Sequence, residues 1–199
     1  AMALWDVGNR TLPPEVPEVG RFAGRGLYKA LEVGQSQGRQ VVVFHEEDMA
    51  IDLGGIGKGY GVDRAVSVLR SWGITKAVVN VGGDLYAMGV SEDGDPWKVG
   101  VRSPDDPNGL ATTLEMSDRG VATSGDYHQY FEHRGRRYHH LLDPVTGAPS
   151  DGRIRSVTVA AESCMAADAA ATTSFVASVA KARGVMARVA PGSEVIHTV

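Results

Sequence analysis

The chain is organised around one glycine-rich stretch, Asp52-Leu53-Gly54-Gly55-Ile56-Gly57-Lys58-Gly59-Tyr60-Gly61-Val62-Asp63. It precedes an amphipathic segment, Val62 to Trp72, in which apolar residues repeat at helical spacing. Glycine lets backbone N–H groups approach a ligand closely, and the first turn of a following helix carries partial positive charge. With Lys58, the stretch predicts a cradle for an anion such as phosphate. Because its spacing fits neither the P-loop nor GxGxxG, a ligand-free strand-to-helix turn remains the alternative.

Size and composition indicate one domain, 1–199, since 199 residues with 43% hydrophobic side chains can bury a sizeable core. A net charge of −4 gives no electrostatic basis for binding nucleic acid. No apolar run has the length of a transmembrane segment, and the first residues do not resemble a signal peptide. The single cysteine, Cys164, predicts a reduced structural thiol rather than a disulfide. The compartment stays unknown.

The pattern of the chain predicts an α+β fold with a mixed, largely antiparallel sheet and packed helices, because most predicted strands follow one another directly. Residues 127–143 predict a hairpin that turns at Arg134-Gly135. In the second predicted helix we expect the buried stripe to be Met165, Ala169, Thr172, Val176 and Val179. We expect a connector with one short helix at 8–24, further strands at 40–45, 49–52, 77–81, 85–90, 97–102, 156–161 and 193–199, and helices at 62–72 and 165–182.

Asp168 and Thr172 are four residues apart in the second predicted helix, so their oxygens project from one face. A carboxylate and a hydroxyl are hard ligands that suit Mg²⁺. The alternative is a surface aspartate beside a threonine that bonds back to its own helix.

Histidines are concentrated in the predicted hairpin, at positions 128, 133, 139 and 140. A zinc site is the alternative that this clustering raises. We do not favour it, because no cysteine is near and His139 and His140 would face opposite sides of a strand.

Further motifs follow the glycine-rich stretch in a fixed order. Together with that stretch, they resemble the ApbE family, the FAD:protein FMN transferases, from about Leu4 to the C-terminus. The fold is therefore expected to be ApbE-like, which is a T-fold-like arrangement. The motifs are Asn80-Val81-Gly82-Gly83-Asp84, Ala122-Thr123-Ser124-Gly125-Asp126-Tyr127, His139-His140-Leu141-Leu142-Asp143-Pro144-Val145-Thr146-Gly147 and Ala166-Ala167-Asp168-Ala169-Ala170-Ala171-Thr172.

The resemblance implies a set of site residues. It places Mg²⁺ on Asp168 and Thr172, with the backbone carbonyl of Gly55 as a third ligand. His140 is the expected general base, since a histidine near neutral pKa can deprotonate an acceptor hydroxyl, and Asp143 is expected to orient that chemistry. The residues expected to contact the flavin nucleotide are Asp52, Lys58, Ser124, Gly125, Asp126, Tyr127 and His140.

The implied activity is a Mg²⁺-dependent transfer of FMN from FAD to a Thr or Ser of an acceptor flavoprotein, with release of AMP. Two alternatives stay open: a Mg²⁺-dependent FAD pyrophosphatase, and a non-catalytic flavin-binding paralogue. Family members generally carry a further N-terminal portion before the residues that match Leu4-Trp5, and many are exported. We therefore expect an open flavin-ring side, which could also support a homodimer.

Overall fold

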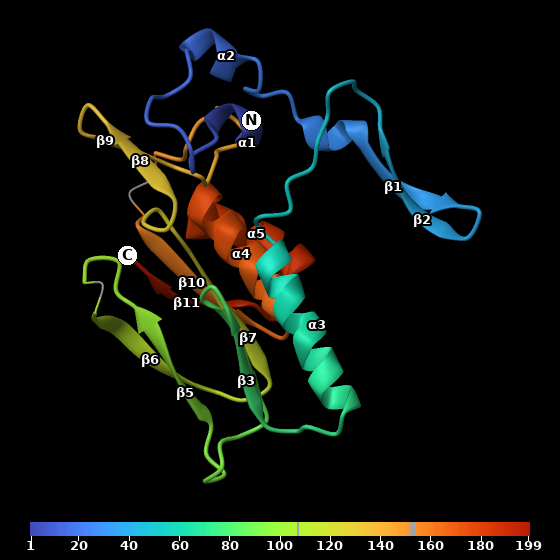
Figure 1. Ribbon diagram of the computed structural model, residues 1–199, viewed down its shortest axis with the longest axis vertical. Helices are drawn as coiled ribbons and strands as arrows, with labels where there is room; N and C mark the ends of the chain where they lie inside the picture. Colours follow the sequence, from blue (N-terminus) through green and yellow to red (C-terminus); the bar gives the residue numbers. More distant parts are fainter. Residues whose placement is uncertain (107, 152–153) are drawn as a thin grey trace. The chain divides into compact units, whose positions relative to one another are not determined.

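A computed structural model of the chain describes residues 1–106, 108–151 and 154–199. These residues form two compact units, Ala1–Asp52 with Phe131–Ser150 and Leu53–Tyr130 with Asp151–Val199. Both units combine helices with antiparallel strands (Figure 1). The predicted α+β class with a largely antiparallel sheet is confirmed.

The second unit is built on a five-stranded antiparallel sheet with the order β11-β10-β7-β4-β3. A separate hairpin, β5–β6, pairs with itself. Three helices, α3, α4 and α5, complete the unit (Figure 1). The bounds are α3 Gly57–Ser71, β3 Ala77–Val81, β4 Asp84–Met88, β5 Trp97–Arg102, β6 Leu110–Met116, β7 Arg119–Gly125, β10 Ser156–Ala161, α4 Cys164–Ala177, α5 Val179–Val189 and β11 Glu194–Thr198.

The central strand β4 is buried on both faces and therefore joins two layers of core. Tyr86 and Met88 pack with Val62 of α3. Leu85 and Ala87, which alternate with them, pack toward the β5–β6 hairpin. The sheet is thus enclosed by helices on one face and by the hairpin on the other.

Helix α3 begins at Gly57, five residues before the predicted start at Val62. Gly57, Gly59 and Gly61 are inside the helix, whereas Gly54 and Gly55 lie in the turn before it. Gly59 is there because α4 lies against it: a Cβ at Gly59 would lie 2.4 Å from the carbonyl oxygen of Cys164. One turn later, Asp63 accepts hydrogen bonds from the backbone N–H groups of Cys164 and Met165, at 2.8 and 2.9 Å. The start of α4 is therefore fixed against α3.

The single helix predicted for 165–182 is wrong, because Ser178 (φ 64°, ψ 150°) interrupts it and separates α4 from α5. The predicted buried stripe is also wrong: Met165 is 40% exposed. An alanine-rich helix has little contrast between faces, so its periodicity does not identify the buried one. The side chains that α4 buries are Cys164, Ala167, Asp168, Ala170, Ala171, Ser174 and Phe175.

The first unit has an aromatic core. Tyr138 stacks on Trp5 and on Phe131, with ring centroids 5.8 and 5.1 Å apart. The Trp5 indole N–H donates to the carbonyl of Gly147 at 2.8 Å, which ties the N-terminal helix to the chain beyond the hairpin. The bounds are α1 Met2–Trp5, α2 Val16–Gly20, η1 Leu27–Ala30, β1 Leu31–Ser36, β2 Arg39–Phe44, β8 Tyr130–His133 and β9 Arg136–His139.

The other predicted elements of this unit have mixed outcomes. The short helix at 8–24 (α2), the strand near 40–45 (β2) and the turn at Arg134-Gly135 are confirmed. The strand predicted at 49–52 is wrong, and those residues form no strand. The partner of β2 is instead β1, which the sequence did not indicate. The predicted return arm of the hairpin ends at His139 instead of Asp143.

Within the described residues, no helix combines the length and the apolar character needed to cross a membrane.

Two glycines of α3 provide a matched test of this packing. Gly59→Ala should destabilise the protein by about 1–3 kcal/mol, because its Cβ meets the backbone of α4. Gly61→Ala has open space around its Cβ and should be neutral or stabilising by up to about 1 kcal/mol, the helix-propensity difference. Urea denaturation measures both. Equal effects of the two substitutions would contradict the close approach of α3 and α4.

Candidate functional site

Three charged side chains of the second unit meet where α3, β4 and α4 come together. The Lys58 ammonium, in the first turn of α3, lies 2.6 Å from Oδ2 of Asp84 and 3.6 Å from Oδ1 of Asp168. The other oxygen of Asp168 accepts a hydrogen bond from the Gly59 N–H at 3.2 Å. Asp84 and Asp168 are only 1% and 3% exposed, whereas the Lys58 side chain is 44% exposed. One half-exposed cation therefore faces two buried carboxylates.

Asp84 is held rigidly as the first residue of β4. It follows a turn through Gly82 and Gly83, which both have positive φ values (61° and 101°). The turn is tied by a 3.1 Å hydrogen bond from the Gly83 N–H to the side-chain oxygen of Asn80. The turn lies over the lysine stem, since a Cβ at Gly82 would be 3.6 Å from Cδ of Lys58.

The proximity of these groups changes their proton affinities. The pKa of the Asp84 carboxyl is raised to about 7, chiefly by burial; the Lys58 ammonium opposes this rise, and repulsion by Asp168 adds to it. Burial alone would lower the pKa of Lys58, but its hydrogen bonds and ion pairs with the two aspartates outweigh burial and raise it. Lys58 is therefore charged at neutral pH.

Two of the predicted metal ligands, Thr172 and Gly55, lie side by side in the second unit. Thr172 lies one turn after Asp168 in α4, and its hydroxyl is 3.2 Å from the hydroxyl of Ser124 at the end of β7. A Cβ at Gly55 would lie 3.4 Å from the Thr172 methyl group and 3.5 Å from its hydroxyl. The alternative of a surface aspartate is excluded by the burial of Asp168. It is the neighbouring Thr173 that bonds back to its own helix, at 2.8 Å to the carbonyl of Ala169.

This donor set fits Mg²⁺. A buried carboxylate, a hydroxyl one helical turn away and an adjacent glycine backbone provide hard oxygens, and magnesium takes its remaining ligands from water and phosphate. Across 1–106, 108–151 and 154–199, no three His, Cys, Asp or Glu side chains are grouped to hold a metal ion. A metal here therefore depends on hydroxyl and backbone oxygens as well as on Asp168.

The Ser124–Tyr127 segment lies at the end of β7, which includes Ser124 and Gly125 as its last two residues. The Tyr127 ring folds over Gly125, where a Cβ would lie 2.5 Å from the ring, and it contacts the His128 ring with centroids 4.4 Å apart. Burial raises the pKa of Tyr127. Asp126 forms an ion pair with Arg155 at 3.3 Å. The rings of Tyr127 and His128 therefore lie together just after the end of β7.

The remaining predicted residues, Asp52, His140 and Asp143, belong to the first unit. Asp143 has a clear local role: Oδ1 accepts from the Val145 N–H at 2.8 Å and stabilises the turn around Pro144. His140 is partly buried after β9. Their participation in one site with Asp168 stays a prediction from the sequence.

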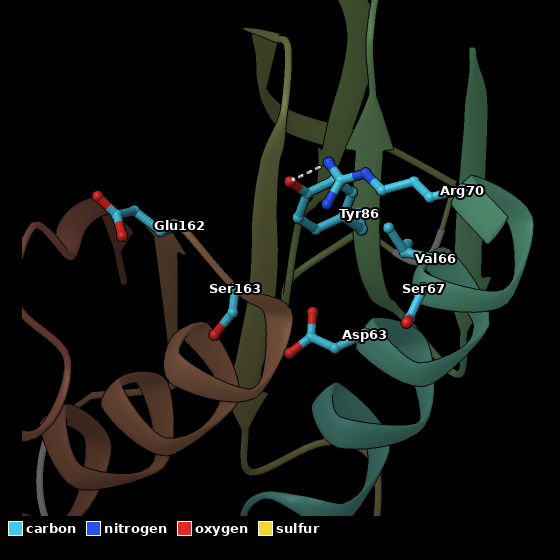
Figure 2. Close-up of a pocket in the computed structure, with 7 residues that line it drawn as sticks. All are labelled: Asp63, Val66, Ser67, Arg70, Tyr86, Glu162 and Ser163. Atoms are coloured by element: carbon cyan, nitrogen blue, oxygen red, sulfur yellow. Dashed lines mark hydrogen bonds between the residues drawn. The ribbon is translucent and has the colours of Figure 1, made fainter. Parts of the chain in front are cut away.

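A separate groove of about 280 Å³ lies beside α3 in the second unit and contains none of the predicted site residues. Figure 2 shows Arg70 reaching over Tyr86, with its guanidinium donating to the phenol oxygen at 3.2 Å. Asp63 and Ser163 lie at its other end, where α3 meets the start of α4 (Figure 2). Helix α3 thus contacts α4 at two positions about one helical turn apart: the Gly59 N–H bonds to Asp168, and Asp63 accepts from the Cys164 N–H.

The sequence did not predict Asp84 as a residue of the site, and it did not predict that Asp63 would support the site by holding the start of α4. Asp84 was visible as an aspartate directly after two glycines and before a strongly apolar strand. A carboxylate at the start of a buried strand needs a partner, which is the signal that could have identified it.

Comparison with known proteins identifies the family of this chain. The ApbE family profile matches residues 1–197. The FAD:protein FMN transferase of Vibrio cholerae is 38% identical over 170 residues, which is 85% of this chain and 51% of that protein. The FAD:protein FMN transferase of Escherichia coli K12 is 33% identical over 190 residues, 93% of this chain and 54% of that protein.

Solved structures give the same result. The crystal structure of the ApbE protein of Thermotoga maritima superposes with a TM-score of 0.77 at 35% identity, covering 87% of this chain and 55% of that one. The flavin transferase ApbE of Vibrio cholerae gives 0.76 at 32% identity, covering 94% and 59%. This chain belongs to the ApbE family. It spans about half the length of the curated relatives that it matches.

Proposed function

We propose that this chain, as a single ApbE-like domain of residues 1–199, acts in the Mg²⁺-dependent transfer of FMN from FAD to a Thr or Ser of an acceptor flavoprotein, with release of AMP. The observation that carries the proposal is the buried Asp168 carboxylate with Thr172 one helical turn later and Gly55 beside that threonine, in a chain whose relatives are FAD:protein FMN transferases. Transfer of a nucleotidyl group needs charge stabilisation at a phosphate, and hard oxygen ligands serve that need.

In the proposed reaction, Asp168, Thr172 and the Gly55 carbonyl would hold Mg²⁺, which supplies neutralisation of the charge that develops on the pyrophosphate. Lys58 has three N–H donors, so it can bind Asp84 and still donate to a phosphate oxygen. The Ser124–Tyr127 segment would line the nucleotide with backbone and hydroxyl donors.

The first unit would provide the proton transfer. His140 removes the proton from the acceptor hydroxyl, whose oxygen forms a bond to the FMN phosphorus as the bond to the AMP phosphate breaks. The FMN then remains on the acceptor as a phosphoester. If water takes the place of the acceptor, the same steps release free FMN and AMP, which is the pyrophosphatase alternative.

Mass spectrometry of a candidate acceptor after incubation with FAD, Mg²⁺ and this chain distinguishes the functions. A mass increase equal to one FMN phosphoester with an equimolar amount of AMP supports transfer. AMP with free FMN and an unmodified acceptor supports the pyrophosphatase. No AMP in either reaction contradicts both enzymatic functions and leaves the non-catalytic paralogue.

The metal ligands can be tested with neighbouring threonines. Asp168→Ala should abolish Mg²⁺-dependent AMP release, and Thr172→Ala should weaken it, because each removes an oxygen ligand. Thr173→Ala is the matched control, since that hydroxyl bonds to the Ala169 carbonyl in the same helix, and it should keep its Mg²⁺ dependence. Rates over a Mg²⁺ titration measure the effect. An unchanged Mg²⁺ dependence in Asp168→Ala would remove the metal site from α4.

The proposed general base can be tested separately. His140→Ala should slow transfer by roughly 10²–10⁴-fold, the usual contribution of a positioned acid–base group, while FAD binding is retained. His133→Ala, in the same hairpin, is the control and should react at the normal rate. Single-turnover rates and calorimetric FAD titration give the two quantities. A folded His140→Ala protein that no longer binds FAD would refute this division of roles.

A further inference from the structure

We propose that Asp84 is a positioning residue that keeps Lys58 away from Asp168, and so leaves the Asp168 carboxylate available to a divalent cation. The proposal rests on the metal site of the proposed function and assigns a role in it to a residue that would not itself be a ligand. The observation that supports it is a difference between two distances: the Lys58 ammonium is 2.6 Å from Asp84 but 3.6 Å from Asp168.

Lys58 stands where it could neutralise Asp168. A charge-assisted N–H···O bond is normally 2.7–2.9 Å long, so the 3.6 Å separation is an ion pair without a close hydrogen bond. Oδ2 of Asp168 accepts a hydrogen bond from the Gly59 N–H, whereas Oδ1 is the oxygen that faces the Lys58 ammonium. If Lys58 moved onto Oδ1, its positive charge would oppose the binding of a metal ion to the same carboxylate.

Asp84 is suited to hold Lys58 because its surroundings restrict its side chain. It is buried at the start of the central strand β4, and the preceding turn lies against the lysine stem. Lysine carries a point charge on a flexible stem, and in this structure the charge lies closer to Asp84 than to Asp168. When both carboxyl groups are ionised, two carboxylates and one ammonium leave a net charge of minus one, which favours a bound cation.

Removing the Asp84 charge should release Lys58 toward Asp168. Asp84→Asn keeps the shape of the side chain, and it should weaken divalent-cation binding by about 10–100-fold, the usual effect of changing a group that orients a metal ligand. Lys58→Met removes the competing cation and should bind the metal at least as tightly as the parent protein. The double variant, Asp84→Asn with Lys58→Met, should regain the parent affinity, because no ammonium remains to occupy Asp168.

The experiment is a titration of the full chain with Mn²⁺ alone, in which electron paramagnetic resonance measures the free Mn²⁺. Addition of Mg²⁺ then tests whether it displaces the bound Mn²⁺. Mn²⁺ prefers the same carboxylate and carbonyl oxygens. Asp118→Asn is the matched control: it removes an exposed carboxylate paired with Arg70 and should leave Mn²⁺ affinity unchanged. Circular dichroism and thermal unfolding verify that each variant is folded.

The outcomes separate this inference from the proposed function. Loss of Mn²⁺ binding in Asp168→Ala supports the metal site, whereas no Mn²⁺ binding by the parent protein overturns that site. If the parent binds Mn²⁺, an unchanged affinity in Asp84→Asn, or a double variant that stays weak, overturns the role of Asp84. If Asp84→Asn does not fold, Lys58→Met decides alone: tighter or equal binding supports the competition, and weaker binding overturns it.

Discussion

The second unit depends on an ammonium group shared unequally between two buried carboxylates. Lys58, Asp84 and Asp168 come from α3, β4 and α4, so their contacts join three elements that are far apart in sequence. Burying a carboxylate is costly unless it is paired, and removing one partner of such a pair typically costs about 3–5 kcal/mol. The arrangement is therefore a constraint on the fold as well as the electrostatic basis of the candidate site.

Close backbone contacts make this charge cluster possible. The start of α4 lies against Gly59 on one side and against Gly120 of β7 on the other, where a Cβ would be 2.5 Å from the Cys164 backbone. These approaches bring the Gly59 N–H to Asp168 and the end of β7 to Thr172. The glycine-rich stretch thus has two roles. Gly55 leaves space beside a hydroxyl, and Gly59 lets two helices approach.

The sequence predicted the parts of the fold that rest on local patterns. Alternating or β-branched segments predicted β3, β5, β10 and β11. The Arg134-Gly135 pair between two strand-like segments predicted the turn of the hairpin, and both residues have positive φ values. Strand β1 was missed because Leu31–Ser36 lacks a β-branched run, and its structure depends on pairing with β2. The break at Ser178 was missed because alanine and valine occur on both sides of it, so the composition does not change where the helix ends.

The candidate site was predictable to the extent that its motifs are local. The spacing of Asp168 and Thr172 placed both on one helical face, and in the structure Gly55 lies beside Thr172. The role of Asp84 could not be derived in the same way, because its partner Lys58 is 26 positions away in the chain. A motif shows which side chains are available, whereas the sheet order and helix contacts determine which charges neutralise one another.

A crystal structure of the chain with Mn²⁺ and FAD, with the anomalous signal used to locate the metal, tests the central claim most directly. The account predicts one anomalous peak within bonding distance of the Asp168 carboxylate and the Thr172 hydroxyl, with the Lys58 ammonium still on Asp84. A peak at other residues, or a Lys58 ammonium bonded to Asp168 beside an occupied metal site, would contradict it.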